Sequence, residues 1–569
     1  MVIYMKYLVS SCEMKEIDER TIEGMGIPAI VLMEHAAMKV AETVEAYLKE
    51  QKCANQRILV CCGTGNNGAD GIAAARILYG KGYEVTISIV GDMKSASSLF
   101  LQQKEIAENF SVPIISKLDF AEYTIDENTI LIDAIFGIGL SREVTGIYKD
   151  IINKINTSVK RKVFSVDVPS GLSSDNGFPQ GAAVKADVTI SFGYSKIGLV
   201  MYPGCEYAGK VEIADIGFAP LGKIGMSLKY HTFEREDLIL LPPRKAYSNK
   251  GSYKKVLVVA GSATMSGAAF FSAKAAYMTG AGLVKVITSE NNRISLQTSL
   301  PEALLYTYKE EELTRNALDL LAEEIKWADV CVIGPGIGRS EISEKILTLI
   351  LENIEVPLII DGDAIWLLGQ KLNSLIDSSR EKVKEEDFSP GEPVNHNILA
   401  ELSVSKSADK SIQKFADNTN ENKIEERIAS LKGILPAKTI LTPHLKELSY
   451  LLGVPVEVIQ KELLHMADNC IKENNLIFTI KDARTVVASK EHQYINMSGN
   501  NGMATGGSGD VLTGIIAGLI AGGLTEFLAA ALGVYLHGLA GDYACRELGE
   551  YSLMASDIIK YLPEAMSLE

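Results

Sequence analysis

The chain alternates short apolar runs rich in Val, Ile and Leu with segments of helical periodicity, and it does so twice. The first series of apolar runs is Ile58–Cys62, Val85–Val90, Ile130–Ile132, Val163–Val166 and Val188–Phe192. The second is Val256–Ala260, Leu283–Thr288, Val330–Ile333, Leu358–Ile360, Thr439–Leu441 and Leu476–Ile480. Buried strands separated by helical crossovers are typical of parallel sheets covered by helices. The sequence therefore predicts an α/β protein with two mostly parallel sheets.

The polar stretch Gly222–Asp237 separates the two series, so we expect domains at residues 1–225 and 226–569. The length of 569 residues alone allows two to four domains, at about 100 to 200 residues each. Residues 377–432 carry 21 charged side chains and only two aromatic ones. Such a stretch buries too little apolar area to offset its ordering entropy. We interpret it as a polar insertion on the surface, with short helices at Ile398–Val404 and Ile424–Leu431.

Charge and composition limit the partners. The 56 Lys and Arg against 72 Asp and Glu give a net charge of −16, which argues against nucleic acid or an anionic membrane as the main partner. The apolar segment Val511–Leu524 is interrupted by glycines and stops at Glu526, which favours a buried helix over a membrane span. Eight cysteines without Cys-x-x-Cys spacing, and no apolar signal segment, favour a reducing cytoplasm. Domains of this kind often associate, so a homo-oligomer is expected.

A glycine-rich segment follows the first predicted strand. Gly63, Gly65 and Gly68 satisfy G-x-G-x-x-G between a strand and the helical segment Ile72–Leu78, so backbone amides and a helix N-terminus are available to a phosphate. Spacing alone does not distinguish a nucleotide site from a tight turn. Asn66, Asn67 and Asp70 add side-chain oxygens suited to an ion or to ligand hydroxyls.

Two more predicted strands end in carboxylates. Asp133 follows Ile130–Ile132, and Asp167 follows Val163–Val166. Either aspartate alone is more often a helix cap or a turn former. Because the carboxyl ends of parallel strands form the ligand crevice, we expect both to converge with the asparagine segment.

At these positions the chain resembles the NAD(P)HX epimerase family. The resemblance rests on Cys62–Gly71, Asp133–Leu140, Ser165–Leu172 and Leu32–Ala36. In the last of these motifs and just after it, His35 and Ala37 stand at positions where the family more often has Asn and Gly. It covers about residues 12–218 and implies a Rossmann-like three-layer α/β/α domain. The implied contacts of the hydrated dinucleotide are Asn66, Asn67, Gly68, Ala69, Asp70, Gly137, Ile138, Gly139, Leu140, Ser141, Arg142, Glu143 and Asp167.

The resemblance also implies roles. Asn67, Asp133 and Ser170 would help to hold a potassium ion, and Asp167 would contact the altered nicotinamide ring as the catalytic acid/base. Ala69 stands where the family usually has a second glycine after the asparagines. The implied chemistry interconverts the R and S forms of NADHX and NADPHX, which carry a hydroxyl at C6. A carboxylate suits this proton transfer if burial and neighbouring charge tune its pKa.

The second half contains another glycine-rich segment, Asn500–Asp510, which runs into the apolar segment Val511–Gly518. Gly506, Gly507 and Gly509, together with Ser508, allow successive N–H groups to point at an anion beside a helix N-terminus. Asp510 is then badly placed to bind phosphate but well placed to take a proton from an attacking hydroxyl. A helix cap is the alternative interpretation. The segment lacks G-x-x-x-x-G-K-[ST] and is no Walker P-loop.

This half resembles the ribokinase-like, ADP-dependent NAD(P)HX dehydratase family over about residues 235–565. The matching motifs are Asn249–Tyr253, Ala260–Ser262, Ser266–Ala268, Gly334–Gly338, Asp361–Ala364, Leu441–His444 and Thr505–Asp510. The resemblance implies a ribokinase-like α/β/α domain. Its implied substrate contacts are Ala268, Gly336, His444 and Asp510, and its implied nucleotide contacts are Lys481, Asp482, Ala483, Arg484, Thr485 and Gly509. Asp482 replaces a usual glycine, and His444 alone is more often a turn histidine.

The implied reaction is phosphorylation of the C6 hydroxyl of the S epimer by ADP, or by ATP in some relatives, with Asp510 as the catalytic base. Elimination of phosphate restores NADH or NADPH and leaves AMP from ADP, with Mg²⁺ expected on the donor phosphates. The main hypothesis is a bifunctional enzyme that repairs damaged nicotinamide nucleotides. The alternatives are a ribokinase-like small-molecule kinase fused to a dinucleotide-sensing domain, and an inactive N-terminal recognition scaffold.

Overall fold

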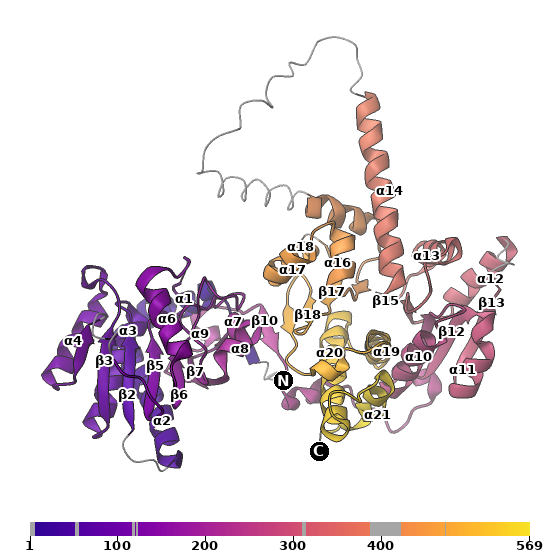
Figure 1. Cartoon of the computed structure of the whole chain (residues 1–569). Coiled ribbons are helices and arrows are strands. Elements are labelled where there is room, and N and C mark those ends of the chain that lie inside the picture. Colours follow the sequence, from indigo (N-terminus) through magenta and orange to yellow (C-terminus); the bar gives the residue numbers. More distant parts are fainter. Residues whose placement is uncertain are drawn as a thin grey trace, which may run out of the picture. The chain divides into compact units, whose positions relative to one another are not determined.

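The computed structural model describes residues 6–51, 56–116, 120, 123–140, 142–309, 315–386, 423–472 and 474–568. They belong to two compact units, Lys6–His231 (the N-terminal unit) and Thr232–Glu569 (the C-terminal unit). Figure 1 colours the first from indigo to magenta and the second from magenta to yellow.

Seven parallel strands form the sheet of the N-terminal unit, in the order β4-β3-β2-β5-β6-β7-β9. They are β2 (Arg57–Cys62), β3 (Glu84–Ile89), β4 (Ile114–Ser116), β5 (Thr129–Ala134), β6 (Lys162–Val166), β7 (Val188–Phe192) and β9 (Lys210–Ala214). The short strands β1 (Lys6–Val9) and β8 (Ser195–Lys196) pair with each other in parallel. The five strands predicted here are confirmed. The direction of winding reverses between β2 and β5, as in doubly wound sheets.

Helices cover both faces of this sheet because alternate residues of its strands are buried on opposite sides. Ile58, Val60 and Cys62 of β2 pack with α2 (Ala29–Gln51), α3 (Asn66–Gly80) and α4 (Ser98–Asn109). Leu59 and Cys61 pack with α6 (Gly146–Thr157). The remaining elements are α1 (Ser11–Glu19), η1 (Arg20–Gly24), η2 (Met93–Ser95), α7 (Ile197–Val200), α8 (Gly204–Ala208), α9 (Leu221–Ile224) and β10 (Tyr230–Thr232).

Nine strands follow one another in the C-terminal unit, in the order β13-β12-β11-β14-β15-β16-β17-β18-β19. They are β11 (Lys255–Val259), β12 (Leu283–Ser289), β13 (Leu304–Tyr308), β14 (Val330–Ile333), β15 (Leu358–Ile360), β16 (Ile440–Leu441), β17 (Ile477–Ile480), β18 (Val486–Ala488) and β19 (Gln493–Ile495). The strands from β13 to β17 are parallel, and β18 and β19 pair antiparallel. The six predicted strands and the α/β class are confirmed.

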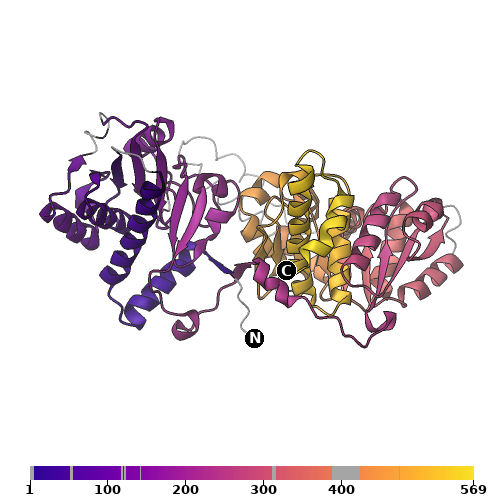
Figure 2. The same ribbon diagram turned by 90° about the horizontal axis from the view of Figure 1, so that it is seen from below.

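One layer of this unit consists of α10 (Ser266–Met278), α19 (Ser508–Ala521), α20 (Glu526–Leu548) and α21 (Ala555–Ala565), which pack on Val256 and Val258 of β11. Figure 2 shows the last three as neighbouring yellow helices. Leu257 and Val259 are equally buried but lie outside that cluster, so the opposite face is covered too. The other helices are η3 (Arg235–Leu240), η4 (Lys250–Ser252), η5 (Glu290–Asn292), α11 (Arg293–Ser299), α12 (Arg315–Ile325), α13 (Glu341–Asn353), α14 (Asp363–Glu386), α16 (Leu445–Leu452), α17 (Val456–Lys461), α18 (Leu463–Ile471) and η7 (Asn501–Met503).

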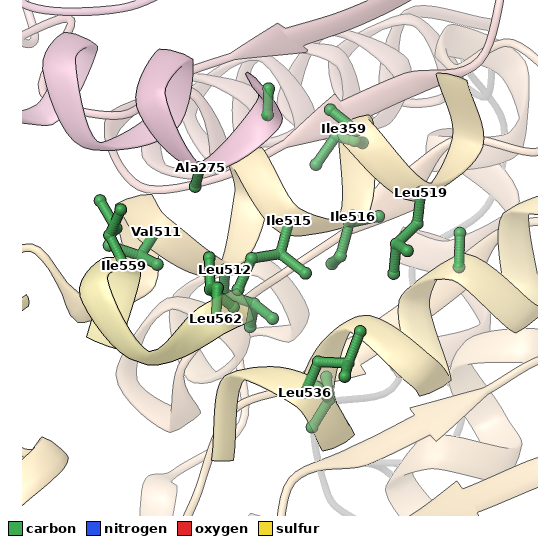
Figure 3. Close-up of a cluster of buried hydrophobic side chains, with 14 of the residues drawn as sticks. Ala275, Ile359, Val511, Leu512, Ile515, Ile516, Leu519, Leu536, Ile559 and Leu562 are labelled. Atoms are coloured by element: carbon green, nitrogen blue, oxygen red, sulfur yellow. The ribbon is translucent and has the colours of Figure 1, made fainter. Parts of the chain in front are cut away.

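Helix α19 is buried on all sides, as the segment Val511–Leu524 predicts. In Figure 3 its apolar side chains, among them Val511, Ile515 and Leu519, lie among residues of α10, α20 and α21. Among the described residues, no helix is long and apolar enough to cross a membrane.

The predicted polar insertion is only partly described. Helix α14 continues to Glu386, and residues 423–434 are helical, with Ile424, Ile428 and Leu431 buried. The helix expected at Ile424–Leu431 is confirmed, and both ends of the insertion are therefore regular structure. The helix expected at Ile398–Val404 lies outside the described residues.

Candidate active sites

The first candidate site lies at the carboxyl ends of β2, β5 and β6, where the winding of the N-terminal sheet reverses. Gly63 follows β2, Asp133 is the penultimate residue of β5, and Asp167 follows β6. Ligands of open parallel sheets bind at this position. The expected convergence of these three segments is thus present in the fold.

The asparagine segment is helical, whereas the sequence predicts a loop before Ile72. Helix α3 begins at Asn66 with Gly65 as its N-cap, so Asn66, Asn67 and Asp70 occupy its first turns. A side chain at Gly68 would place its Cβ 1.7 Å from the Gly63 carbonyl oxygen, which explains the glycine there. Ala69 is buried in this helix, where alanine is favourable and glycine is not required.

Asp133 is fully buried and accepts four hydrogen bonds. Its Oδ2 accepts from Ser165 Oγ and Ser170 N, both at 2.8 Å, and its Oδ1 accepts from Ser170 Oγ and Ile135 N. Burial raises the pKa of Asp133, and these donors partly oppose the effect. Among the described residues, no Lys or Arg forms an ion pair with it. A buried acid without a basic partner fits a bound cation.

The predicted potassium ligands offer a carboxylate, a hydroxyl and an amide oxygen, which suit a hard monovalent cation. Asp133 and Ser170 are in direct contact, and Ser170 Oγ also accepts from Phe136 N at 2.8 Å. Asn67 reaches the same loop, with its Oδ1 3.1 Å from the position of a Cβ on Gly137. Four donors already bind the carboxylate oxygens of Asp133. We therefore expect Asp133 to stabilise a bound cation mainly through its charge and less through a free lone pair.

Asp167 stands in an unusual backbone conformation, with φ of 65° in a region that side chains other than glycine rarely adopt. Its Oδ1 lies 2.5 Å from Nζ of Lys196, which is 1 % exposed and also donates to the Phe192 carbonyl at 2.9 Å. The unusual conformation and the buried ion pair together hold the predicted acid/base in one position.

Two further carboxyl groups interact with Asp167. Burial, then the charges of Asp167 and Asp18, raise the pKa of Asp70 well above its usual value. Burial and Asp167 also raise the pKa of Asp18, while Lys196 opposes the shift. The site therefore combines the carboxyl group of Asp167, which is paired with Lys196, with a second carboxyl group, Asp70, whose burial favours its protonated form.

The loop Gly137–Glu143 lies beside Asn67 and reaches the surface. Gly137, Ile138 and Leu140 are partly buried, whereas Gly139, Arg142 and Glu143 are exposed. Ser141 lies outside the described residues. This loop is placed to contact parts of a ligand that extend out of the crevice.

The second candidate site is a pocket of about 350 Å³ in the C-terminal unit, at the carboxyl end of its sheet. The predicted contacts Ala268, Gly336 and Asp510 line it. The other lining residues are Met265, Gly267, Phe271, Gly362, Asp363, Glu447 and Gly507. The pocket is thus bounded by the N-terminal ends of α10, α14 and α19.

A buried ion pair controls the charge of this pocket. Asp361, at the end of β15, accepts from Lys481 Nζ at 2.5 Å and from Thr442 Oγ at 2.7 Å. Burial alone would lower the pKa of Lys481, but Asp361 and Glu447 outweigh it and raise the pKa. Burial raises the pKa of both Asp510 and Glu447 to about 7; Asp361 adds to these shifts and Lys481 opposes them. Asp510 and Glu447 can therefore each take up or release a proton near neutral pH.

His444 is the N-cap of α16. Its Nδ1 accepts from the N–H groups of Lys446 and Glu447, both at 3.1 Å. Nδ1 therefore carries no proton, and Nε2–H is the donor, 3.4 Å from Oε1 of Glu447. Burial lowers the pKa of His444. His444 can be both a structural turn histidine and a substrate contact, because capping uses Nδ1 and leaves Nε2 for a ligand.

The predicted nucleotide segment is the turn between β17 and β18. Lys481 points inward, and its Nζ lies 3.3 Å from the position of a Cβ on Gly509. Asp482 and Ala483 are exposed, and Arg484 donates to the Met497 carbonyl. Thr485 Oγ1 donates to the carbonyl of Asp482. The segment and Gly509 therefore lie together.

Within the described ranges, no group of three or more His, Cys, Asp or Glu side chains could hold a metal ion. Mg²⁺ commonly binds through one or two carboxylates and substrate phosphates. The carboxylates of Asp363 and Glu447 in the pocket lining fit that arrangement.

Sequence reasoning missed several residues of both sites. Lys196 carries a weak signal, since it is a lysine flanked by Ser195 and Ile197 just after a buried strand. Asp361 lies in the matching motif Asp361–Ala364 but was given no role there, although it follows a predicted strand as Asp133 and Asp167 do. Asp18 and Glu447 lie within helices, where no strand end marks them.

Comparison with known proteins assigns both units. The family described as "YjeF-related protein N-terminus" matches residues 29–198, and the "NAD(P)H-hydrate dehydratase" family matches residues 256–385 and 422–564. A bifunctional NAD(P)H-hydrate repair enzyme of Moorella thermoacetica is 34% identical over 98% of this chain and 96% of its own. The Escherichia coli enzyme of that description is 30% identical over 90% of this chain and 85% of its own.

A solved ADP/ATP-dependent NAD(P)H-hydrate dehydratase from Bacillus subtilis, co-crystallised with ATP and Mg²⁺, is 25% identical, with a TM-score of 0.42 over 59% of this chain and 96% of that one. Both relatives match across the two units of this chain and are named for one bifunctional repair activity, which disfavours a fused small-molecule kinase and an inactive scaffold. The chain belongs to the family of bifunctional NAD(P)H-hydrate repair enzymes.

Proposed function

We propose that the N-terminal unit interconverts the R and S epimers of NADHX and NADPHX, and that the C-terminal unit converts the S epimer into NADH or NADPH with ADP, giving AMP and phosphate. The observation that carries the proposal is Asp510, a carboxyl group with a pKa of about 7 that lines a pocket at the N-terminus of α19. A base of this pKa suits deprotonation of a hydroxyl at neutral pH.

In the dehydratase reaction, Asp510 takes the proton of the C6 hydroxyl as its oxygen attacks the terminal phosphoryl group of ADP. The free N–H groups at the start of α19 face the transferred phosphoryl group, and Lys481 and the turn to Thr485 hold the nucleotide. The phosphate then leaves C6 with its bonding electrons, and loss of a ring proton forms the double bond. Ala268, Gly336 and the Nε2–H of His444 contact the hydrated substrate.

In the epimerase reaction, an acid must protonate the departing C6 oxygen and a base must deprotonate the oxygen that returns on the other face. Asp70, whose burial favours its protonated form, would supply the acid, and Asp167, which is paired with Lys196, would supply the base. Lys196 orients Asp167 through their ion pair. Asn66, Asn67 and the loop Gly137–Glu143 bind the dinucleotide.

Each site has a cation in this proposal. Asn67, Asp133 and Ser170 would hold K⁺, which supplies positive charge beside the dinucleotide phosphates. Asp363 and Glu447 would hold Mg²⁺ with the nucleotide, where the ion neutralises charge on the phosphates. The burial of Asp133, which has no ion-pair partner within the described part of the chain, and the acidic lining of the pocket support these assignments.

The test uses purified full-length chain with chemically hydrated NADPH, ADP, Mg²⁺ and K⁺. We expect recovery of reduced-nicotinamide absorbance from both epimers, with AMP as a product. Asp167→Asn should leave consumption of the S epimer intact and slow that of R to its spontaneous rate. Phosphorylation of a small alcohol without absorbance recovery would support a kinase instead.

The pH dependence follows from Asp510. A base is active when deprotonated, so kcat/KM of the dehydratase should fall about tenfold per pH unit as the pH drops below about 7. A rate measured from pH 5.5 to 8.5 with the S epimer checks this. A rate independent of pH through that range would remove Asp510 from the role of base.

We also propose a cytoplasmic location and a homo-oligomeric state. The free cysteines of the described chain are compatible with a reducing compartment. Light scattering on the purified chain measures the oligomeric state.

A further inference from the structure

Helix α20 forms hydrogen bonds with the segment between β19 and α19, which leads to the proposed phosphate site. At the beginning of this segment, Ser498 Oγ donates to the Tyr535 carbonyl at 2.9 Å. Asp542 accepts from Gly499 N and Asn500 Nδ2, both at 2.9 Å. At its end, His537 Nε2 lies 3.0 Å from the Ser508 carbonyl oxygen and 3.3 Å from Ser508 Oγ. The connection from β19 to α19 is thus fixed to one helix at both ends.

The contact with the carbonyl determines the tautomer of His537. A carbonyl oxygen only accepts, so Nε2 must carry the proton. Burial lowers the pKa of His537 to about 4, and nearby Lys481 adds to the shift, so the ring is neutral at physiological pH. His537 is therefore a neutral Nε2–H donor to the first residue of α19.

The accepting carbonyl belongs to the peptide unit that ends in the N–H of Gly509. This N–H is among the first of α19 and has no partner within the helix. A hydrogen bond to one end of a peptide group polarises it and strengthens the donor at the other end. Gly509 adjoins Asp510 and lies beside Lys481, so its N–H is available to an anion in the pocket.

We propose that His537 is a positioning residue of the dehydratase, which orients and polarises the Ser508–Gly509 peptide so that the Gly509 N–H binds the transferred phosphoryl group. His537 is not among the residues that line the pocket. The inference rests on the proposed function, since it requires phosphoryl transfer at this pocket.

Two substitutions of His537 distinguish the effect of its hydrogen bond on catalysis from the effect of its packing. In His537→Gln the side-chain N–H takes the place of the Nε2–H, whereas His537→Leu fills a similar space without a donor. We expect the Leu variant to lower kcat for S-NADPHX about tenfold, with the KM values of hydrate and ADP within twofold. The Gln variant should stay within about threefold of the parent. His465→Leu, at an exposed position on α18, is the matched control and should change neither constant.

Equal impairment of the Gln and Leu variants would overturn the proposal, because packing of the ring alone would then explain the loss. A second measurement does not depend on activity or on folding of the Leu variant. In ¹⁵N-histidine-labelled parent protein, the signal missing from His537→Gln should show protonated Nε2 and bare Nδ1 at pH 7. An Nδ1–H tautomer, or an imidazolium at pH 7, would overturn the inference. An inactive parent with the expected tautomer would instead refute the phosphoryl-transfer role and the proposed function together.

Discussion

Asp510 combines two properties that oppose each other. Its burial makes it a base of useful strength, and the same burial makes its ionised form unfavourable in the folded chain. Because its folded pKa is raised, Asp510 favours folding below its unfolded pKa of about 4, and this contribution is lost as the pH rises through about 7.

Asp510→Asn should therefore abolish dehydration and stabilise the C-terminal unit at pH 8. We expect a gain in the free energy of unfolding of roughly 1–3 kcal/mol, discounted for partial exposure, that shrinks toward zero near pH 4. Thermal unfolding at both pH values measures it. The exposed Asp319→Asn is the control and should change neither stability nor activity. A destabilised Asp510→Asn at pH 8 would contradict the argument.

Lys196 is the corresponding residue of the epimerase site. Lys196→Met should leave Asp167 buried without a partner, destabilise the N-terminal unit by about 3 kcal/mol and abolish epimerisation. Dehydration of the S epimer should persist, since it belongs to the other unit. Lys196→Met with Asp167→Asn should regain stability but not activity, and Lys210→Met, from an exposed ion pair, should have neither effect. Full epimerase activity in Lys196→Met would exclude the role assigned to the pair.

At the scale of elements, the glycines of α19 set how closely it approaches α10. A Cβ on Gly514 would lie 2.2 Å from the Ser272 carbonyl oxygen. Both helices supply residues of the pocket lining, Ala268 from α10 and Asp510 from α19. Their separation therefore determines the width of the active site.

Gly514→Ala should force the two helices apart, cost about 3 kcal/mol of unfolding free energy and reduce kcat of the dehydratase by more than tenfold. The control is Gly433→Ala, in the helix at residues 423–434, where a Cβ meets nothing within 4 Å. That change should stabilise by up to about 1 kcal/mol, as alanine does in helices. Denaturant unfolding of both variants compares them directly. An unaffected Gly514→Ala would show that the helices adjust freely.

The elements that sequence predicts best are those buried on both faces. The central strands β2 and β11 are continuous apolar runs because helices cover both sides of them. The edge strands β9 and β13 were missed because their residues are half exposed and mixed in polarity. The start of α3 was missed because its N-cap, Gly65, has no side chain to signal it. Single charged residues such as Lys196 and Glu447 act through neighbours distant in sequence, which no local pattern reveals.

At the scale of the whole molecule, the described residues at both ends of the predicted polar insertion, 377–386 and 423–432, are helical. Replacing residues 387–422 by a flexible Gly/Ser linker should leave the unfolding temperature within about 2 °C and the dehydratase active. Replacing 377–432 instead removes the buried Ile424, Ile428 and Leu431 and should cost several kcal/mol. The unfolding temperature and the rate of S-epimer turnover are measured for both deletion variants and compared with those of the parent protein. Loss of folding in the shorter deletion would show that the core depends on it.

Helix α19 lies inside the C-terminal unit with apolar neighbours on every side. The amides of its interior can then exchange with solvent only when the surrounding helices open with it, in one cooperative event. We therefore expect the backbone of the proposed phosphate site to be anchored in a slowly exchanging part of this unit. Heating should therefore inactivate the dehydratase in step with global unfolding, without an earlier stage in which the active site melts alone.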